Sequence, residues 1–146
     1  MRNDFVSLQT DIEKDGLKAR GFTDDGPVRK TILIYSPDLN FCFSLSLALE
    51  DRYHVVTTSN TSMLESLACT NAADVLIIDT IPSTEIARLV DVLKSHRPGI
   101  HVILTYVYDA RDDTFDKSIR GHVEAVIYKP FEVDSILSEV EQLLIA

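Results

Sequence analysis

The sequence has little cysteine and no closely spaced histidines. Its two cysteines, Cys42 and Cys69, cannot make a disulfide framework, and both fall in predicted helices, where a reduced cysteine behaves as a small hydrophobic residue. The four histidines are scattered, and no pair has the spacing of metal ligands. The sequence therefore predicts neither a disulfide-stabilised fold nor a zinc site.

Long apolar runs are also missing. No stretch approaches the roughly 20 apolar residues that a membrane-spanning helix needs. Residues 1–16 are polar and mixed in charge, and they lack the apolar core of a secretory signal. We therefore expect no membrane association and a cytoplasmic location.

Basic residues are too few for a nucleic-acid-binding surface. The 146 residues include 14 Lys and Arg against 23 Asp and Glu, which gives a formal net charge of −9. Residues 1–30 hold six basic and six acidic side chains, so the rest of the chain carries all of the excess negative charge. Binding to a phosphate backbone needs a basic face. The composition argues against direct nucleic-acid binding and fits a protein partner better.

The chain is expected to divide into an N-terminal arm, residues 1–29, and one domain, residues 30–146. Within the arm, Phe5, Leu8 and Ile12 have helical spacing, and the glycines and proline that follow indicate a linker. We expect the arm to be disordered or to form a short helix for docking or dimerisation. The length and the 45% content of hydrophobic residues suffice for one domain with a buried core.

Apolar runs and amphipathic segments alternate along the predicted domain. Asp38 or Asn40, and further on Ser83 or Thr84, are the expected caps of two of its helices. The alternation predicts an α/β fold, a flavodoxin-like doubly wound five-stranded parallel sheet in strand order 2-1-3-4-5 with helices on both faces. The predicted strands are residues 31–36, 53–58, 74–79, 100–106 and 123–128, and the predicted helices are 39–50, 60–69, 83–97, a short one within 109–120, and 133–144.

Polar residues end three of the predicted strands. Asp79, Thr105 and Lys129 each follow an apolar run, and the carboxyl ends of parallel strands meet at one edge of a sheet. A carboxylate that attacks a phosphoryl donor, a lysine that offsets the charge and a hydroxyl that binds a phosphoryl oxygen would form a phosphate-accepting site. The alternative is three solvated residues at the rim of the sheet, with Asp79 and Lys129 as an ordinary ion pair.

From about residue 30 to residue 144, the sequence resembles the receiver domain of two-component response regulators. The resemblance rests on four segments: Ile32-Leu-Ile-Tyr, Val75-Leu-Ile-Ile-Asp, Ile103-Leu-Thr and Tyr128-Lys-Pro-Phe. It implies that Asp79 is the phosphoacceptor, Thr105 the switch hydroxyl and Lys129 the phosphate-contacting lysine, with a cis peptide bond before Pro130. It also implies a histidine kinase or an effector as protein partner.

The metal-binding part of the receiver pattern is altered. Ser36 and Pro37 stand where the family has an acidic pair that holds Mg²⁺ together with the acceptor aspartate. Asp38 and Asp79 are left as the candidate metal ligands, whereas a hard divalent cation needs several oxygen ligands. We therefore expect impaired Mg²⁺ binding and no required cofactor.

Two further positions depart from the pattern. Tyr106 replaces the small residue that usually follows the switch hydroxyl, and its ring is expected to cover Asp79. Val126 occupies the place of the family's switch aromatic, which removes the coupled swing of hydroxyl and ring.

The face that the family commonly uses for partners combines the fourth helix, fifth strand and fifth helix. Acidic residues are expected to make this face acidic, and at least two of three nearby aromatic residues are expected to be packed. The acidic residues are Asp112, Asp113, Asp116, Glu139 and Glu141, and the aromatic ones are Tyr106, Tyr108 and Phe115.

These departures favour an atypical receiver, or pseudo-receiver: a non-enzymatic signalling domain that acts through protein partners, with a homodimer as a further candidate arrangement. The alternative is a functional response regulator phosphorylated on Asp79 by a histidine kinase. A nucleotide or flavin binder would need a glycine- or hydroxyl-rich loop after the first strand, and residues 36–40 contain no glycine. A hydrolase with Asp79 as nucleophile would need a general base, for which Asp38 is the one candidate.

Overall fold

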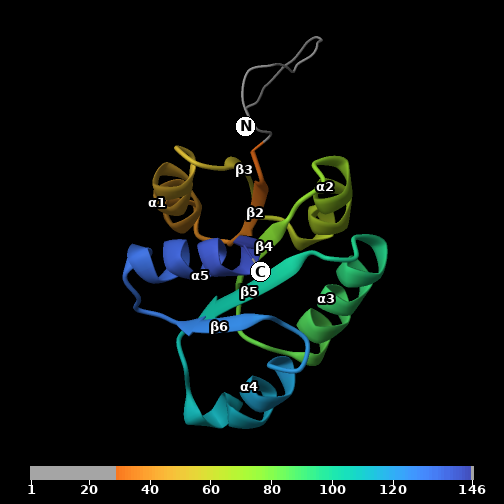
Figure 1. Cartoon of the computed structure of the whole chain (residues 1–146). Coiled ribbons are helices and arrows are strands. Elements are labelled where there is room, and N and C mark those ends of the chain that lie inside the picture. Colours follow the sequence, from red (N-terminus) through yellow and green to blue (C-terminus); the bar gives the residue numbers. More distant parts are fainter. Residues whose placement is uncertain (1–28, 146) are drawn as a thin grey trace.

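Five apolar segments form a parallel sheet in the computed structural model, which describes residues 29–145 (Figure 1). The strand order across the sheet is β3-β2-β4-β5-β6, and every neighbouring pair is parallel. Counted along the chain, this is the predicted order 2-1-3-4-5, so the flavodoxin-like fold is confirmed. The strands are β2 (Thr31–Tyr35), β3 (His54–Thr58), β4 (Val75–Asp79), β5 (His101–Tyr106) and β6 (Ala125–Tyr128).

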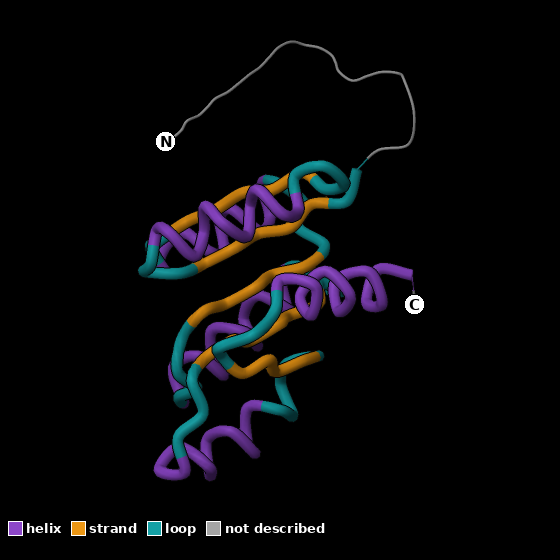
Figure 2. The backbone as a smooth tube through the Cα atoms, turned by 90° about the vertical axis from the view of Figure 1, so that its left-hand side faces the viewer, coloured by secondary structure: helices purple, strands orange, loops and turns teal. Residues whose placement is uncertain are grey.

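Helices connect the strands and cover both faces of the sheet. Figure 2 views the molecule from the side of α1 and α5, which pack on one face, while the remaining helices pack on the other. Within residues 29–145, no helix has the length and apolar character that crossing a membrane requires. The helices are α1 (Leu39–Leu49), η2 (Thr61–Met63), α2 (Leu64–Thr70), α3 (Thr84–His96), η3 (Ala110–Asp112), α4 (Asp113–Ile119) and α5 (Val133–Ile145).

Side-chain caps fix where two of these helices begin. Asp38 Oδ1 accepts hydrogen bonds from the backbone N–H groups of Asn40 at 2.9 Å and Phe41 at 3.4 Å, so Asp38, rather than Asn40, caps α1. Ser83 Oγ accepts from the N–H of Ile86 at 3.1 Å and caps α3. These bonds satisfy N–H groups that have no partner within the helix. The carboxylate of Asp38 is thereby directed toward its own helix.

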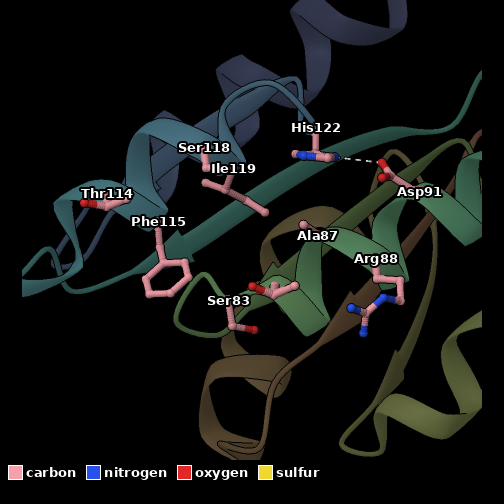
Figure 3. A pocket seen from close by; sticks show the side chains of 10 residues that line it. Ser83, Ala87, Arg88, Asp91, Thr114, Phe115, Ser118, Ile119 and His122 are labelled. Carbon is pink, nitrogen blue, oxygen red and sulfur yellow. Dashed lines mark hydrogen bonds and ion pairs between the residues drawn. The ribbon is translucent and has the colours of Figure 1, made fainter.

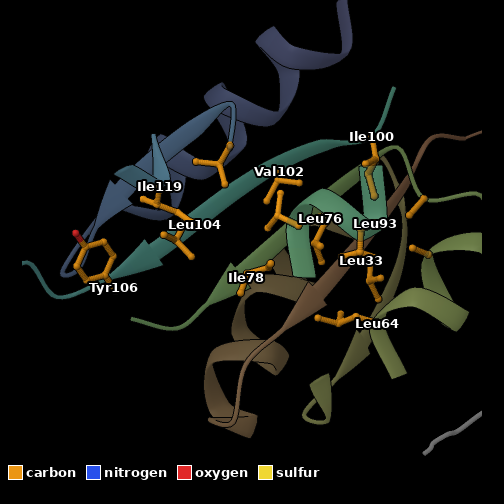
Figure 4. Packing of buried hydrophobic residues seen from close by; sticks show 14 residues of the cluster. Leu33, Leu64, Leu76, Ile78, Leu93, Ile100, Val102, Leu104, Tyr106 and Ile119 are labelled. Carbon is orange, nitrogen blue, oxygen red and sulfur yellow. The ribbon is translucent and has the colours of Figure 1, made fainter. Parts of the chain in front are cut away.

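The core consists of two apolar layers because side chains alternate across each strand. Ile34, Ile77 and Ile103 lie in the layer between the sheet and the helices α1 and α5. Their chain neighbours, such as Leu33 and Leu104, lie in the layer that faces α2, α3 and α4, part of which Figure 4 shows. Alternate residues along each strand therefore lie in opposite layers of the core.

The two cysteines differ in exposure, which gives a simple test of this packing. Cys42 is buried in α1, and Cys69 is exposed in α2. Burial raises the pKa of the Cys42 thiol to about 11, a hydrogen bond to the backbone of Ser36 opposes this, and the charges of Asp79 and Asp38 add to it. Since the thiolate is the reactive form, we predict that the native protein consumes one equivalent of Ellman's reagent rapidly and a second on unfolding.

Single substitutions assign the fast thiol. Cys69→Ser should abolish the rapid phase, and Cys42→Ser should leave it unchanged. Two rapid equivalents in the native protein would contradict the packing of α1 against the sheet.

Candidate functional site

The carboxylate of Asp79 lies at the end of β4 and is held by three side chains. Asp79 is 7% exposed. Ser36 Oγ donates to its Oδ2 at 2.6 Å, while Thr105 Oγ1 and Lys129 Nζ donate to its Oδ1 at 3.2 and 3.1 Å. The structure thus brings together Asp79, Thr105 and Lys129, as the strand ends predicted. Their roles in phosphate chemistry stay predictions.

Strand register explains why these side chains converge. Asp79 pairs with Thr105 across β4 and β5, so the two side chains project from the same face of the sheet. Ser36 continues the alternation of Ile34 in β2, and its N–H still bonds to the neighbouring strand β3. Lys129 likewise continues β6, where its N–H donates to the carbonyl of Tyr106 at 2.9 Å. All four side chains therefore meet on the face that α1 and α5 cover.

The ammonium of Lys129 lies between a carboxylate and an aromatic ring. Its Nζ is 5.1 Å from the centre of the Phe41 ring, and that ring meets Phe131 edge-on at 6.2 Å. The peptide bond between Lys129 and Pro130 is cis, as the receiver resemblance implies. A groove of about 330 Å³ opens beside Lys129, between α1 and the start of α5, with Asp38 and Val133 also in its wall.

Ser36 acts as a donor at the place where the receiver pattern has an acidic residue. It is fully buried, and its Oγ also accepts a hydrogen bond from the N–H of Asp38 at 2.9 Å. Asp38 itself is exposed and caps α1. Within the part of the chain that the structure describes, no three His, Cys, Asp or Glu residues are grouped so as to hold a metal ion. Mg²⁺ is usually held by one or two carboxylates together with several waters, and of the two candidates here, Asp79 and Asp38, the second is engaged as the cap of α1.

Tyr106 does not cover Asp79, so that expectation was wrong. Strand β5 continues through residue 106, and Tyr106 therefore projects from the face opposite to Thr105. There it is 2% exposed, its hydroxyl donates to Asp116 in α4, and its ring meets Tyr128 edge-on at 5.6 Å. Any effect of Tyr106 on Asp79 would have to pass through the backbone of β5.

A buried carboxylate, Asp116, joins α4 to the sheet. It accepts hydrogen bonds from the hydroxyl of Tyr106 and, at 2.9 Å, from that of Tyr128, and the Nε of Arg120 lies 3.3 Å away. Burial by itself raises the pKa of Asp116, but these hydrogen bonds outweigh it and hold the pKa below the ordinary value. Burial and the bond to Asp116 raise the pKa of Tyr106. We call these four residues the Asp116 network.

The sequence analysis did not identify Tyr128 and Arg120 as members of this network. The one available signal was the spacing of Asp116 and Arg120, which are four residues apart on a helix. Arg120 Nη2 also donates to the hydroxyl of Tyr128 at 2.8 Å, and its guanidinium lies 5.6 Å from the centre of that ring. Val126, at the family's switch-aromatic position, packs partly buried against the core.

Two expectations about this face need correction. Asp116 is 5% exposed and does not contribute to an acidic surface, because its charge is used inside the Asp116 network. Of the three nearby aromatic residues, only Tyr106 is buried, whereas Tyr108 and Phe115 are 41% and 45% exposed. The ring of Tyr108 does pack on Tyr128, at 5.2 Å between centroids, but the residue stays exposed.

A second cavity, of about 390 Å³, opens between α3 and α4 (Figure 3). Its wall combines hydroxyl groups with the exposed ring of Phe115, and at its rim His122 Nδ1 lies 2.8 Å from Asp91 Oδ1. Asp79, Thr105 and Lys129 take no part in it. No sequence motif marked these residues, because they are scattered over two helices without a recurring spacing.

No protein-family model matches the sequence, and no curated protein matches it. Solved structures are similar in fold. A response regulator from Thermotoga maritima is 19% identical with a TM-score of 0.71, and the match covers 82% of this chain and all of that one. A CheY-like receiver domain from Methanospirillum hungatei is 24% identical with a TM-score of 0.66, over 79% and 94% of the two chains.

A protein from Burkholderia thailandensis, provisionally named for pilus assembly, is similar to the same degree. It is 23% identical with a TM-score of 0.66, and the match covers 80% of this chain and 99% of that one. Together these similarities show that the chain has the fold of response-regulator receiver domains. At this level of sequence identity, the similarities show the fold of the chain and do not show its activity.

The Asp116 network makes a testable contribution to stability. Asp116→Asn removes the charge that accepts from two tyrosines and an arginine while keeping the size of the side chain. We predict that the free energy of unfolding falls by roughly 2 kcal/mol, the range of hydrogen bonds to a charged group. Chemical denaturation of the two proteins measures this difference, and Asp113→Asn, at an exposed carboxylate on the same helix, should change it far less.

The same pair of proteins gives a pH test. The pKa of Asp116 is lowered on folding from 3.8, so its contribution is present above that value and is lost as the pH falls through the lower folded-state pKa. The difference between wild type and Asp116→Asn should thus be constant near neutrality and shrink in acid. A difference that persists unchanged far below the ordinary aspartate pKa would contradict this assignment.

Proposed function

We propose that this chain is a receiver-like signalling domain that acts by protein–protein interaction, with a site impaired in Mg²⁺-dependent phosphorylation. The observation that carries the proposal is the 2.6 Å hydrogen bond from Ser36 to Asp79. A hydroxyl at this place adds no negative charge to attract a divalent cation, and it occupies one oxygen of the carboxylate. The second oxygen is occupied by Thr105 and Lys129.

The side chains of the site are balanced in charge, which supports the same proposal. Asp79 and Lys129 form an ion pair at 3.1 Å, with the Asp79 side chain 8% exposed. An additional carboxylate at residue 36 would leave a net negative charge that a cation could neutralise. With serine there, the site does not need a metal ion to offset its charge.

The alternative is a receiver that is phosphorylated on Asp79, with Asp38 as substitute metal ligand. The arrangement of Thr105 and Lys129 around Asp79 favours it, since both would face a phosphoryl group. Against it, Asp38 would have to leave its capping position on α1, at a cost of about 1 kcal/mol. This cost is modest, so the two proposals have to be separated by experiment.

The remaining functional predictions extend the first proposal. We propose that the domain is non-enzymatic, that its partner is a protein, either a histidine kinase or an effector, and that it binds neither nucleic acid nor membranes directly. The fold supports a protein partner in general. A cytoplasmic location and a homodimer stay predictions from the sequence.

Beryllofluoride, a mimic of an aspartyl phosphoryl group, tests whether Asp79 accepts a phosphoryl group. We predict that adding beryllofluoride and millimolar Mg²⁺ leaves the backbone-amide NMR signals of the wild-type domain unchanged. Shifts centred on Asp79, Thr105 and Lys129 that disappear in Asp79→Ala would instead establish a functional phosphoacceptor. A receiver domain of known activity, titrated in parallel, controls for the reagent.

A gain-of-function substitution tests the assigned cause. Ser36→Asp places a second carboxylate beside Asp79, and the two charges should lower the melting temperature without metal. Mg²⁺ should then raise the melting temperature of Ser36→Asp, because a cation that binds the native state stabilises it by mass action. Differential scanning fluorimetry with and without Mg²⁺ measures the effect.

Ser36→Asn is the matched control, since asparagine has a size similar to that of aspartate but carries no charge. It should show no Mg²⁺-dependent shift in melting temperature. An equal response in both variants, or none in Ser36→Asp, would show that Ser36 is not what prevents metal binding.

A further inference from the structure

Helix α1 exposes an apolar face that no described residue covers. Leu39, Phe43 and Leu47 are 70%, 65% and 52% exposed, and they recur every four residues along one side of the helix. The opposite side, with Cys42 and Leu45, is buried against the sheet. No residue of α1 is charged. An apolar stripe on a helix is normally buried against another element.

The size of this face favours a tethered occupant over a second copy of the chain. Three side chains on one 11-residue helix offer well under the roughly 800 Å² per partner that a stable complex buries. A segment of the same chain avoids most of the entropy cost of association, because its effective concentration is high. A small apolar face therefore holds a tethered segment more readily than a separate molecule.

The N-terminal segment is attached near the C-terminal end of α1, from which it can reach the exposed face of this helix. Residues 1–28 lie outside the described part of the chain, which begins at Arg29. The guanidinium of Arg29 donates to the carbonyl of Glu50, the residue that follows α1, at 2.7 Å. The segment therefore starts beside the C-terminal end of α1, and the linker of residues 13–28 can reach about 50 Å, several times the length of this helix.

The sequence of the segment offers a matching apolar face. Phe5, Leu8 and Ile12 are spaced to lie on one side of a helix. In a helix they would span about 10 Å, and Leu39 to Leu47 span about 12 Å. Since α1 has no charged side chain, it would not repel the mixed charges around this stripe.

We propose that residues 5–12 fold back as a helix on the face of α1 formed by Leu39, Phe43 and Leu47. The N-terminal end of α1 carries Asp38 and Phe41, which line the groove beside Lys129. A segment docked along α1 thus borders the Asp79 site, and a partner that uses α1 has to displace it. This proposal is independent of whether Asp79 is phosphorylated.

The absence of tryptophan from the sequence allows a direct test in the full-length chain. Phe5→Trp introduces a single tryptophan into the stripe. We expect its fluorescence maximum to be blue-shifted relative to free N-acetyltryptophanamide, because the indole is buried against α1. Adding Phe43→Ser, or separately Leu47→Ser, should return the maximum to the free value, and both residues are exposed enough for the core to stay intact.

Phe115→Ser is the matched control, because Phe115 is also an exposed aromatic residue but lies on α4. It should leave the blue shift unchanged. A tryptophan with the free emission maximum in the parent variant, or a blue shift that survives both α1 substitutions, would overturn the proposal. So would a blue shift that vanishes on dilution together with a dimeric mass in light scattering, since the occupant would then be a second copy.

Discussion

The central constraint in this structure is a carboxylate that must be satisfied with almost no water around it. Asp79 ends β4, a strand that is buried along its whole length, and its own side chain is 7% exposed. An ionised group at such a position is costly unless it is paired and hydrogen-bonded. Ser36, Thr105 and Lys129 supply the donors, one from each of the other strand ends in reach. The positions of β2 and β5 beside β4, and of β6 beside β5, are thus tied to the chemistry at the end of β4.

Because side chains alternate along the strands, neighbouring residues take part in different sites on the two faces of the same sheet. Thr105 and Tyr106 are neighbours in β5, yet Thr105 bonds Asp79 on one face and Tyr106 bonds Asp116 on the other. Lys129 and Tyr128 repeat this division at the end of β6. The Asp79 site and the Asp116 network therefore share two strands without sharing a side chain. Communication between them has to pass through the backbone of β5 and β6.

The sequence predicted the fold nearly completely and the site in part. The strand order followed from buried apolar runs and right-handed crossovers, and the ends of the strands located Asp79, Thr105 and Lys129 correctly. The expectation for Tyr106 was wrong although the predicted strand also ended at residue 106, because it followed the receiver pattern and not the alternation of side chains, which places Thr105 and Tyr106 on opposite faces of β5. The donation from Ser36 to Asp79 was not foreseen either, since a serine carries no signal of its partner until the register of β2 and β4 is known.

Helix α1 is part of the surroundings of the Asp79 site and does more than cover one face of the sheet. Its cap, Asp38, bonds Ser36 through its own N–H, and Ser36 in turn bonds Asp79. Phe41, the third residue of the helix, lies under the ammonium of Lys129. The position of α1 therefore affects Ser36, which donates to one carboxylate oxygen of Asp79. It also affects the surroundings of Lys129, which donates to the other oxygen. Whatever covers the outer face of α1 stabilises the helix in that position, and so a contact made far from Asp79 bears on how firmly its carboxylate is held.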